Sequence, residues 1–144
     1  MLKFLGDGVL ATLSFTEADR ARTCQNALDA AAETMRKLEM LNAARTASGL
    51  PTVTVDLALH IGEVLYGNVG ATDRLDFTVI GPAVNEVTRI EALCEPLRNT
   101  VLVSAEFAAA LGNIGDRLIS LGHQRLRGVR QAKEIFAPAA SSMS

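Results

Sequence analysis

Asn85 and Arg89 lie four positions apart in a segment with helical periodicity. Residues at this spacing share one face of a helix. An amide beside a guanidinium on the first turns of a helix offers a fork of hydrogen-bond donors, which suits a phosphate or a ribose. The structural alternative is that Arg89 pairs with Glu86 or Glu91 at the surface.

Asp7 stands between two glycines, Gly6 and Gly8, in what reads as a tight turn. A carboxylate at such a place can approach a hard cation closely, because glycines keep other side chains away. The alternative is an ordinary turn aspartate. Lys3, on the apolar segment before this turn, is by itself typical of a strand lysine that keeps its ammonium in water.

Arginines recur near the C-terminal end of the chain. Arg125 and Arg127 stand two positions apart, so they share one face if this segment is a strand. Taken alone, the segment is interpreted as a solvated run of charge.

The elements that would position these residues follow from local pattern. Strands are predicted by apolar alternation or short apolar runs at 2–5, 9–15, 53–61, 75–80, 100–103, 117–127 and 133–137. Helices are predicted at 18–47, from Gly81-Pro82 to Cys94 and, capped by Ser104, at 105–111. The glycine-punctuated stretch 62–70 is predicted to be irregular.

This order of elements predicts an α+β fold, with helices packed on a mostly antiparallel sheet. A ferredoxin-like core normally opens strand–helix–strand. This chain opens with two strands, so the first strand and helix of such a unit are expected to be missing.

Composition narrows the class of protein. The chain has 144 residues, of which 49% are apolar and 21% charged, which predicts one globular domain. A net charge of −2 with 4% aromatic residues argues against binding nucleic acid. No apolar run is long enough for a membrane span, and no signal peptide is expected at the N-terminus. Cys24 and Cys94 are predicted to be buried free thiols in a reducing compartment, hence a cytoplasmic location.

Together, in their order and spacing, these motifs resemble the catalytic domain of class III adenylate and guanylate cyclases over nearly the whole chain. The matching segments are Lys3-x-x-Gly6-Asp7, Leu59-His60-Ile61-Gly62-Glu63-Val64, Gly67-Asn68-Val69-Gly70, Phe77-Thr78-Val79-Ile80-Gly81-Pro82-Ala83-Val84-Asn85-x-x-x-Arg89-Ile90-Glu91 and Leu126-Arg127-Gly128-Val129-Arg130. The resemblance implies a ferredoxin-like nucleotide cyclase fold.

The resemblance also implies an activity and partners. Two catalytic domains pair head to tail, as a homodimer or with another cyclase domain, and each active site draws on both. The 3′-hydroxyl of ATP attacks the α-phosphate, giving 3′,5′-cyclic AMP and pyrophosphate for intracellular signalling. Two divalent ions, Mg²⁺ or Mn²⁺, are held by two aspartates of one partner, where they activate the hydroxyl and stabilise phosphate charge.

Individual residues take roles from this resemblance. Asp7 matches the second metal aspartate. Lys3 and Thr78 match the two positions that recognise the base. This Lys–Thr pair is similar to that of bacterial and soluble adenylate cyclases, whereas guanylate cyclases typically carry an acidic residue at the lysine position, so ATP is expected rather than GTP.

The remaining matches concern ribose and phosphate. Asn85 matches the residue that orients the ribose, and Arg89 the one that stabilises charge developing on the phosphorane. Arg127 or Arg130 matches, loosely, a position that reaches the terminal phosphates.

One element of the family pattern has no counterpart here. The family's first metal aspartate precedes the lysine motif, in a pattern like Phe-x-Asp-Ile-x-Gly-Phe. Residues 1–138 are therefore expected to form a partial domain lacking the first strand and following helices, inactive alone, with a frayed tail at 139–144. The alternative functions are a non-catalytic cyclase-homology module that dimerises with or regulates an intact cyclase, and an α+β domain with no nucleotide role.

Overall fold

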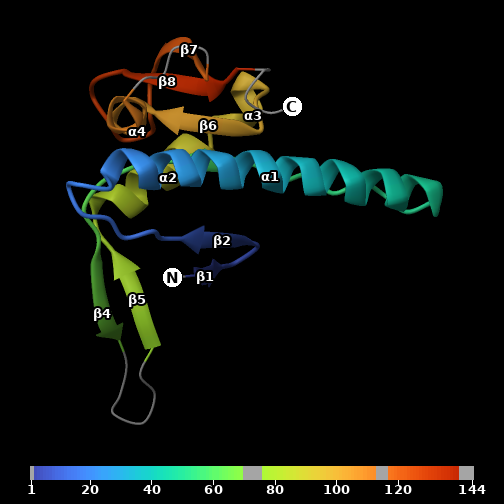
Figure 1. Ribbon diagram of the computed structural model, residues 1–144, viewed down its shortest axis with the longest axis horizontal. Helices are drawn as coiled ribbons and strands as arrows, with labels where there is room; N and C mark the ends of the chain where they lie inside the picture. The colour runs from blue at the N-terminus through green and yellow to red at the C-terminus, as the bar shows by residue number, and fades with distance from the viewer. Residues whose placement is uncertain (1, 70–75, 113–116, 140–144) are drawn as a thin grey trace.

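The computed structural model describes residues 2–69, 76–112 and 117–139 (Figure 1). Its helices are α1 (Arg20–Ala47), α2 (Pro82–Glu91), α3 (Cys94–Leu97) and α4 (Ala105–Leu111). Its strands are β1 (Leu2–Leu5), β2 (Gly8–Ala11), β3 (Leu57–Leu59), β4 (Leu65–Val69), β5 (Asp76–Ile80), β6 (Val101–Ser104), β7 (Leu118–Gln124) and β8 (Lys133–Pro138). The α+β class is confirmed.

Four strands form the central sheet, in the order β3-β6-β8-β7. β3 and β6 run parallel, while β8 pairs antiparallel with both β6 and β7. The other two pairs, β1 with β2 and β4 with β5, are separate antiparallel hairpins. Antiparallel pairing therefore predominates among the described strands, as predicted.

Helices cover both faces of the central sheet, and β6 is therefore buried on both sides. Val103 packs in a cluster with Leu28 of α1 and Phe107 of α4. The preceding residue, Leu102, points the other way, into a second cluster with Ile90 of α2. Successive side chains of a strand face opposite sides, so a strand between two helical layers is apolar throughout.

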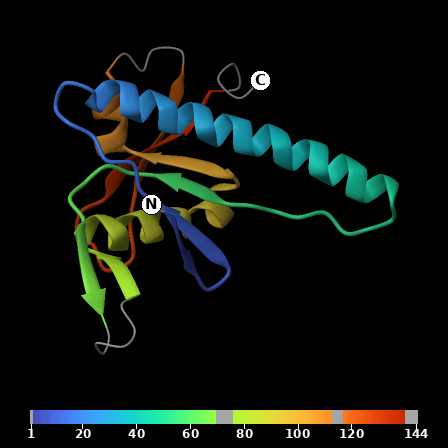
Figure 2. The ribbon, with the colours of Figure 1, turned by 60° about the horizontal axis from the view of Figure 1, so that its bottom comes forward.

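α1 begins and ends close to its predicted limits, because its sequence is rich in helix formers and contains no Gly or Pro. Its buried side chains, Cys24, Leu28, Ala31 and Ala32, all lie in the N-terminal half. The C-terminal half extends beyond the sheet, and the returning chain runs back alongside it (Figure 2). Two hydrogen bonds between the Asn42 side chain and the backbone of Val53, at 2.7 and 2.8 Å, hold that return.

Several predicted boundaries are wrong. The strand predicted at 9–15 ends at Ala11, and the strand predicted at 117–127 ends at Gln124. The strand predicted at 53–61 is limited to β3, because only these three residues pair with β6. The stretch 62–70, predicted to be irregular, contains β4. The helix predicted to reach Cys94 ends at Glu91, and Pro96 lies inside the separate short helix α3.

Other local predictions are confirmed. The hairpin turns at Gly6 and Asp7, and Gly6 has a φ of 61° that favours glycine. The Ser104 side chain caps α4 by accepting a hydrogen bond from the Phe107 amide at 3.0 Å. Both cysteines are buried free thiols. Burial raises the pKa of the Cys94 thiol to about 12, which keeps it protonated.

A backbone hydrogen bond holds the C-terminal end of the described chain. Ala139 donates its amide to the carbonyl of Arg117 at 2.8 Å, and the rest of the expected tail, 140–144, lies outside the described residues.

Within the residues that the structure describes, no helix combines the length and apolar character needed to cross a membrane.

Candidate active site

α2 begins where the chain leaves β5. Gly81, with a φ of 142°, is its N-cap, and Pro82 occupies the first turn as predicted. A side chain at Gly81 would stand 3.1 Å from the carbonyl oxygen of Glu63, so a larger residue here would displace one of the two segments. Close contact with the chain after β3 thus fixes the start of the helix that carries Asn85 and Arg89.

Arg89 and Arg127 come together at one pocket, although 38 positions separate them in the sequence. The pocket has a volume of about 880 Å³ and is lined by Thr88, Arg89, Ala92, Leu93 and residues 125–130. Four arginines and no carboxylate line it. Such a surface attracts anions, and guanidinium groups bind phosphate oxygens in pairs.

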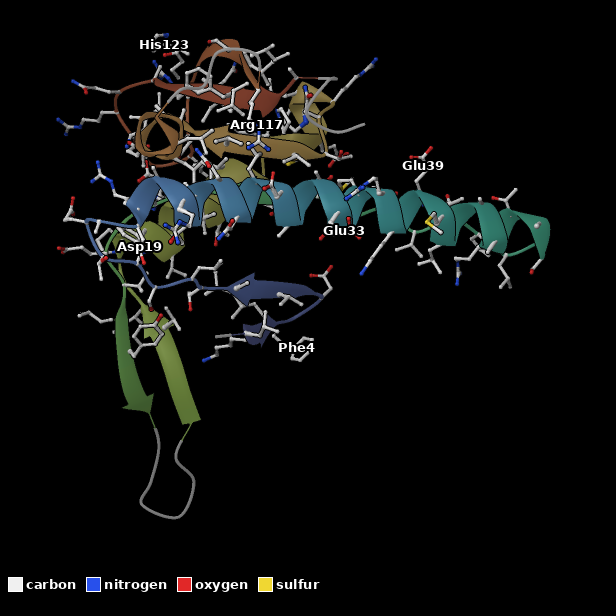
Figure 3. All side chains as sticks on the ribbon, in the orientation of Figure 1. Phe4, Asp19, Glu33, Glu39, Arg117 and His123 are labelled. Carbon is white, nitrogen blue, oxygen red and sulfur yellow. The ribbon has the colours of Figure 1, made fainter. Side chains whose placement is uncertain are left out.

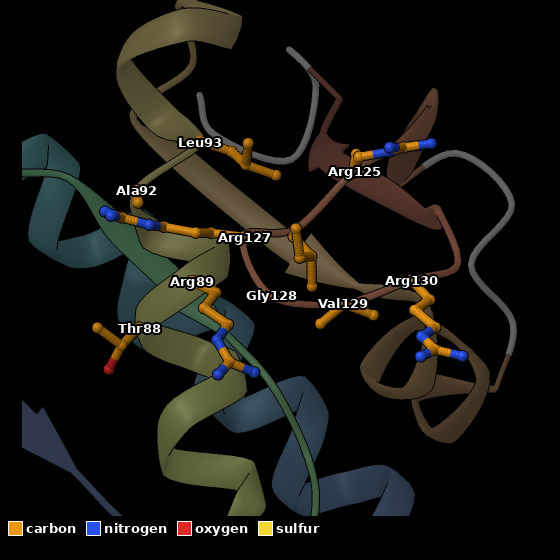
Figure 4. Close-up of a pocket in the computed structure, with 10 residues that line it drawn as sticks. Thr88, Arg89, Ala92, Leu93, Arg125, Arg127, Gly128, Val129 and Arg130 are labelled. Carbon is orange, nitrogen blue, oxygen red and sulfur yellow. The ribbon is translucent and has the colours of Figure 1, made fainter.

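The four arginines differ in direction. Figure 4 shows the Arg127 side chain extending back across α2 toward Ala92, whereas Arg125 extends the opposite way and Arg130 points toward the bottom of the view. The guanidinium of Arg89 lies against Gly128, where an added Cβ would be 3.7 Å from Nη2. Arg127 and Arg130 both line this pocket, and the assignment of either one to the terminal phosphates stays a prediction.

Buried side chains hold these two arginines in place. Ile90, directly after Arg89, and Leu126, directly before Arg127, are each 1% exposed and belong to the same apolar cluster. Each exposed guanidinium is thus carried by a backbone segment that is anchored one residue away. Within the described part of the chain Arg89 forms no ion pair, so the alternative pairing with Glu86 or Glu91 is not found.

Lys3 and Asp7 lie apart from this pocket, on the β1–β2 hairpin. Lys3 is half-buried on β1 and Asp7 is exposed in the turn. A second cavity of about 580 Å³ separates this part of the chain from β3, since residues 10–15 line one side and 57–62 another. A hydrogen bond of 3.0 Å from the Tyr66 hydroxyl to the Thr12 hydroxyl ties the segment after β2 to β4.

The metal prediction can be tested against the residues present. Asp7 is the one residue matched to a metal ligand, and a Mg²⁺ or Mn²⁺ pair needs several oxygen ligands. Among the described residues, no group of three or more acidic, histidine or cysteine side chains could hold an ion. The described residues therefore do not form a complete metal site.

Asn85 lies on α2, whereas Thr78 lies on the preceding strand, β5. Asn85 is exposed on α2, one turn before Arg89, as the helical spacing predicts. Thr78 lies on β5, with its backbone opposite Gly67 of β4, and its side chain lies outside what the structure describes. The described geometry thus places Arg89 and Arg127 at one pocket and leaves Lys3 and Asp7 on a separate element.

A polar cluster around the buried His60, beside α2, was not predicted from the sequence. His60, Glu86, Glu106 and Lys133 come from the end of β3, α2, α4 and β8. The Lys133 ammonium is 2.5 Å from Glu86 Oε1 and 3.2 Å from Glu106 Oε1. His60 Nε2 is 3.2 Å from Glu86 Oε2. The sequence offered one signal for this cluster, a histidine in an otherwise apolar segment.

Burial lowers the pKa of His60 below its usual 6.5, although Glu86 and Glu106 act in the opposite direction. The native state therefore binds fewer protons than the unfolded chain near this pH, and His60 contributes stability that is present above pH 6.5 and is lost as pH falls. We expect the free energy of unfolding to decrease between about pH 7 and pH 5.

Urea unfolding across this range measures the effect. The slope should shrink in His60→Gln and persist in His123→Gln, since His123 is exposed on β7. An unchanged slope in His60→Gln would contradict the assignment.

Comparison with known proteins gives a consistent set of relatives. No family model matches the sequence. The chain is 31% identical over 136 residues to adenylate cyclase 1 of Rhizobium meliloti, a match that covers 94% of this chain and 20% of that protein. The chain spans about a fifth of the length of the curated relatives that it matches first.

Solved structures agree with this result. A bacterial light-regulated adenylyl cyclase superposes with a TM-score of 0.71 at 26% identity, covering 95% of this chain and 38% of the other. The guanylyl cyclase Cya2 superposes with a TM-score of 0.68 at 25% identity, covering 96% of this chain and 68% of the other.

Proposed function

The chain belongs to the catalytic-domain family of class III adenylate and guanylate cyclases, and we propose that it contributes to converting ATP into 3′,5′-cyclic AMP. The 3′-hydroxyl oxygen of ATP forms a bond to the α-phosphorus and gives up its proton. The bond between the α-phosphorus and the bridging oxygen breaks, and pyrophosphate leaves. The net reaction is a cyclisation, with no oxidant or water consumed.

The observation that best supports this proposal is that Arg89 and Arg127 line one pocket that has no lining carboxylate. During the reaction negative charge grows on the α-phosphate oxygens and on the departing pyrophosphate. Donors that are already held in place stabilise such charge without a cost of reorganisation. We assign Arg89 to the α-phosphate, Arg127 to the terminal phosphates and Asn85 to the ribose.

The proposed active unit contains two cyclase domains. This chain supplies Lys3, Thr78, Asn85, Arg89 and Arg127, and the partner domain supplies the aspartates of the divalent ions. Because the described residues do not form a metal site, we expect no turnover from the chain alone.

Exposed apolar side chains support pairing. The β4–β5 hairpin projects from the body of the molecule (Figure 1), and Leu65, Tyr66 and Ile80 on it are 67%, 49% and 53% exposed. Phe4, on the other hairpin, is 80% exposed and lies away from the central sheet (Figure 3). Exposed apolar groups at this density are typical of surfaces that bind another protein.

A complementation assay tests the proposal. The purified chain is mixed with an intact homologous cyclase domain whose own residues at the Asn85 and Arg89 positions are substituted, with Mn²⁺ and ATP present. We expect cyclic AMP from the mixture and none from either protein alone. No product from the mixture would contradict the proposal and favour the alternative, a non-catalytic module that binds or regulates an intact cyclase.

Base selectivity gives a second prediction. Replacing Lys3 by Glu should lower product formation from ATP in this assay by about 10-fold or more, because a carboxylate repels the acceptor nitrogens of adenine that an ammonium would bind. Turnover of GTP should be retained or rise. The control is Lys37→Glu, an exposed lysine of α1, and equal losses in both variants would contradict the role of Lys3.

A further inference from the structure

We infer that Glu86 is a positioning residue, whose carboxylate is held by His60 and Lys133 and fixes the first turns of α2. The inference rests on the proposed function, because it explains how Asn85 and Arg89 are kept where they would meet the nucleotide. Glu86 directly follows Asn85 and precedes Arg89 by about one helical turn.

The two carboxylate oxygens of Glu86 have different partners. Oε1 accepts a hydrogen bond from Lys133 on β8, and Oε2 lies 3.2 Å from Nε2 of His60, just after β3. The Glu86 side chain is 19% exposed, and His60 is 5% exposed. Hydrogen bonds to ionised groups strengthen where water is largely excluded. Glu86 therefore ties α2 to two other elements at once.

His60 extends this connection to α4. A carboxylate can only accept hydrogen bonds, so Nε2 carries the hydrogen of the neutral ring and Nδ1 accepts one from the Ser104 hydroxyl at 2.8 Å. Ser104 Oγ in turn accepts from the Phe107 amide at the start of α4. With Ser104 1% exposed and engaged as a helix cap, this arrangement holds elements together and offers no accessible nucleophile.

The Glu86 contacts add to the close approach between Gly81 and the chain after β3, which positions the start of α2. No side chain caps its N-terminus, and its one buried residue, Ile90, lies near the other end. Asn85, between these ends, is exposed. Among the described contacts, Glu86 is the group that fixes the first turns of α2 against the sheet by ionic hydrogen bonds.

Glu106 provides a matched comparison. It also binds Lys133, at 3.2 Å, and its Oε2 is 3.8 Å from His60 Nδ1. It belongs to α4, however, and is 43% exposed. Glu86→Gln and Glu106→Gln therefore remove the same kind of charge from the same cluster, but only the first acts on α2.

Both variants are tested in the complementation assay. We expect Glu86→Gln to lower kcat by about 10-fold with the KM for ATP changed by less than about 2-fold, since misplaced groups lose contacts made in the transition state. Glu106→Gln should keep kcat within about 2-fold of the parent chain. Equal kcat losses in both variants, or none in Glu86→Gln, would overturn the inference.

A second measurement separates this inference from the proposed function. If the mixture of the parent chain with the partner domain gives no product, the proposed function fails, and amide hydrogen exchange on the isolated chain decides about Glu86. Faster exchange confined to the first turns of α2 in Glu86→Gln, and absent in Glu106→Gln, supports positioning by Glu86. Exchange that is unchanged, or that rises equally in both variants, overturns it.

Discussion

Replacing Arg89 by Ala should lower cyclic AMP formation in the complementation assay by about 100- to 1,000-fold, the loss typical of removing one preorganised donor from developing negative charge. The guanidinium is exposed and forms no ion pair among the described residues, so its removal should leave stability nearly unchanged. The loss should appear in kcat, because the charge that Arg89 stabilises is greatest in the transition state.

Arg125 is the matched control for this prediction. It lines the same pocket and carries the same charge, but its side chain extends away from α2 (Figure 4). Arg125→Ala should keep activity within about 2-fold, whereas Arg127→Ala should raise the KM for ATP. If Arg125→Ala and Arg89→Ala lose equal activity, the pocket acts only through its net charge, and the assignment of Arg89 to the α-phosphate is wrong.

Replacing Leu126 by Ala should lower the free energy of unfolding by about 2–5 kcal/mol, as is typical of a buried leucine truncated to alanine. Leu126 is 1% exposed and packs in the cluster that contains Ile90, Leu102 and Ile135. The cavity left behind would loosen the loop that carries Arg127 against α2. Activity in the complementation assay should therefore fall as well, even under conditions where the variant remains folded.

Urea unfolding measures the first effect, with Met40→Ala as the control. Met40 is 73% exposed on the projecting half of α1, so this substitution should change the free energy of unfolding by no more than about 0.5 kcal/mol. A change below about 1 kcal/mol in Leu126→Ala would show that the cluster adjusts to the loss and does not anchor the loop.

Local signals predicted those elements whose stability depends on their own residues. α1 follows from a long run of helix formers, and α4 from Ser104, whose hydroxyl caps the helix in the expected way. Pro82 marks the first turn of α2. These features form between residues that are close in the sequence, where composition and spacing contain the necessary information.

Strand limits were predicted less well because a strand needs a partner. The alternation at 53–61 suggested a long strand, but only Leu57–Leu59 pairs with β6, while Val53 binds Asn42 of α1. β4 was missed because its glycine suggested an irregular segment. Its pairing with β5, in which Gly67 lies opposite Thr78, overcomes that weak local preference.

The sequence by itself determined the family, the helix that carries Asn85 and Arg89, and the set of arginines near the C-terminal end. Only the tertiary structure decided that Arg127, and not Arg125 or Arg130, extends across α2. It also decided that Glu86 binds His60 and Lys133, the latter 47 positions away, and not its helical neighbour Arg89. The physical reason is that partners of charged groups are chosen by burial and geometry across several elements, which spacing along one helix does not contain.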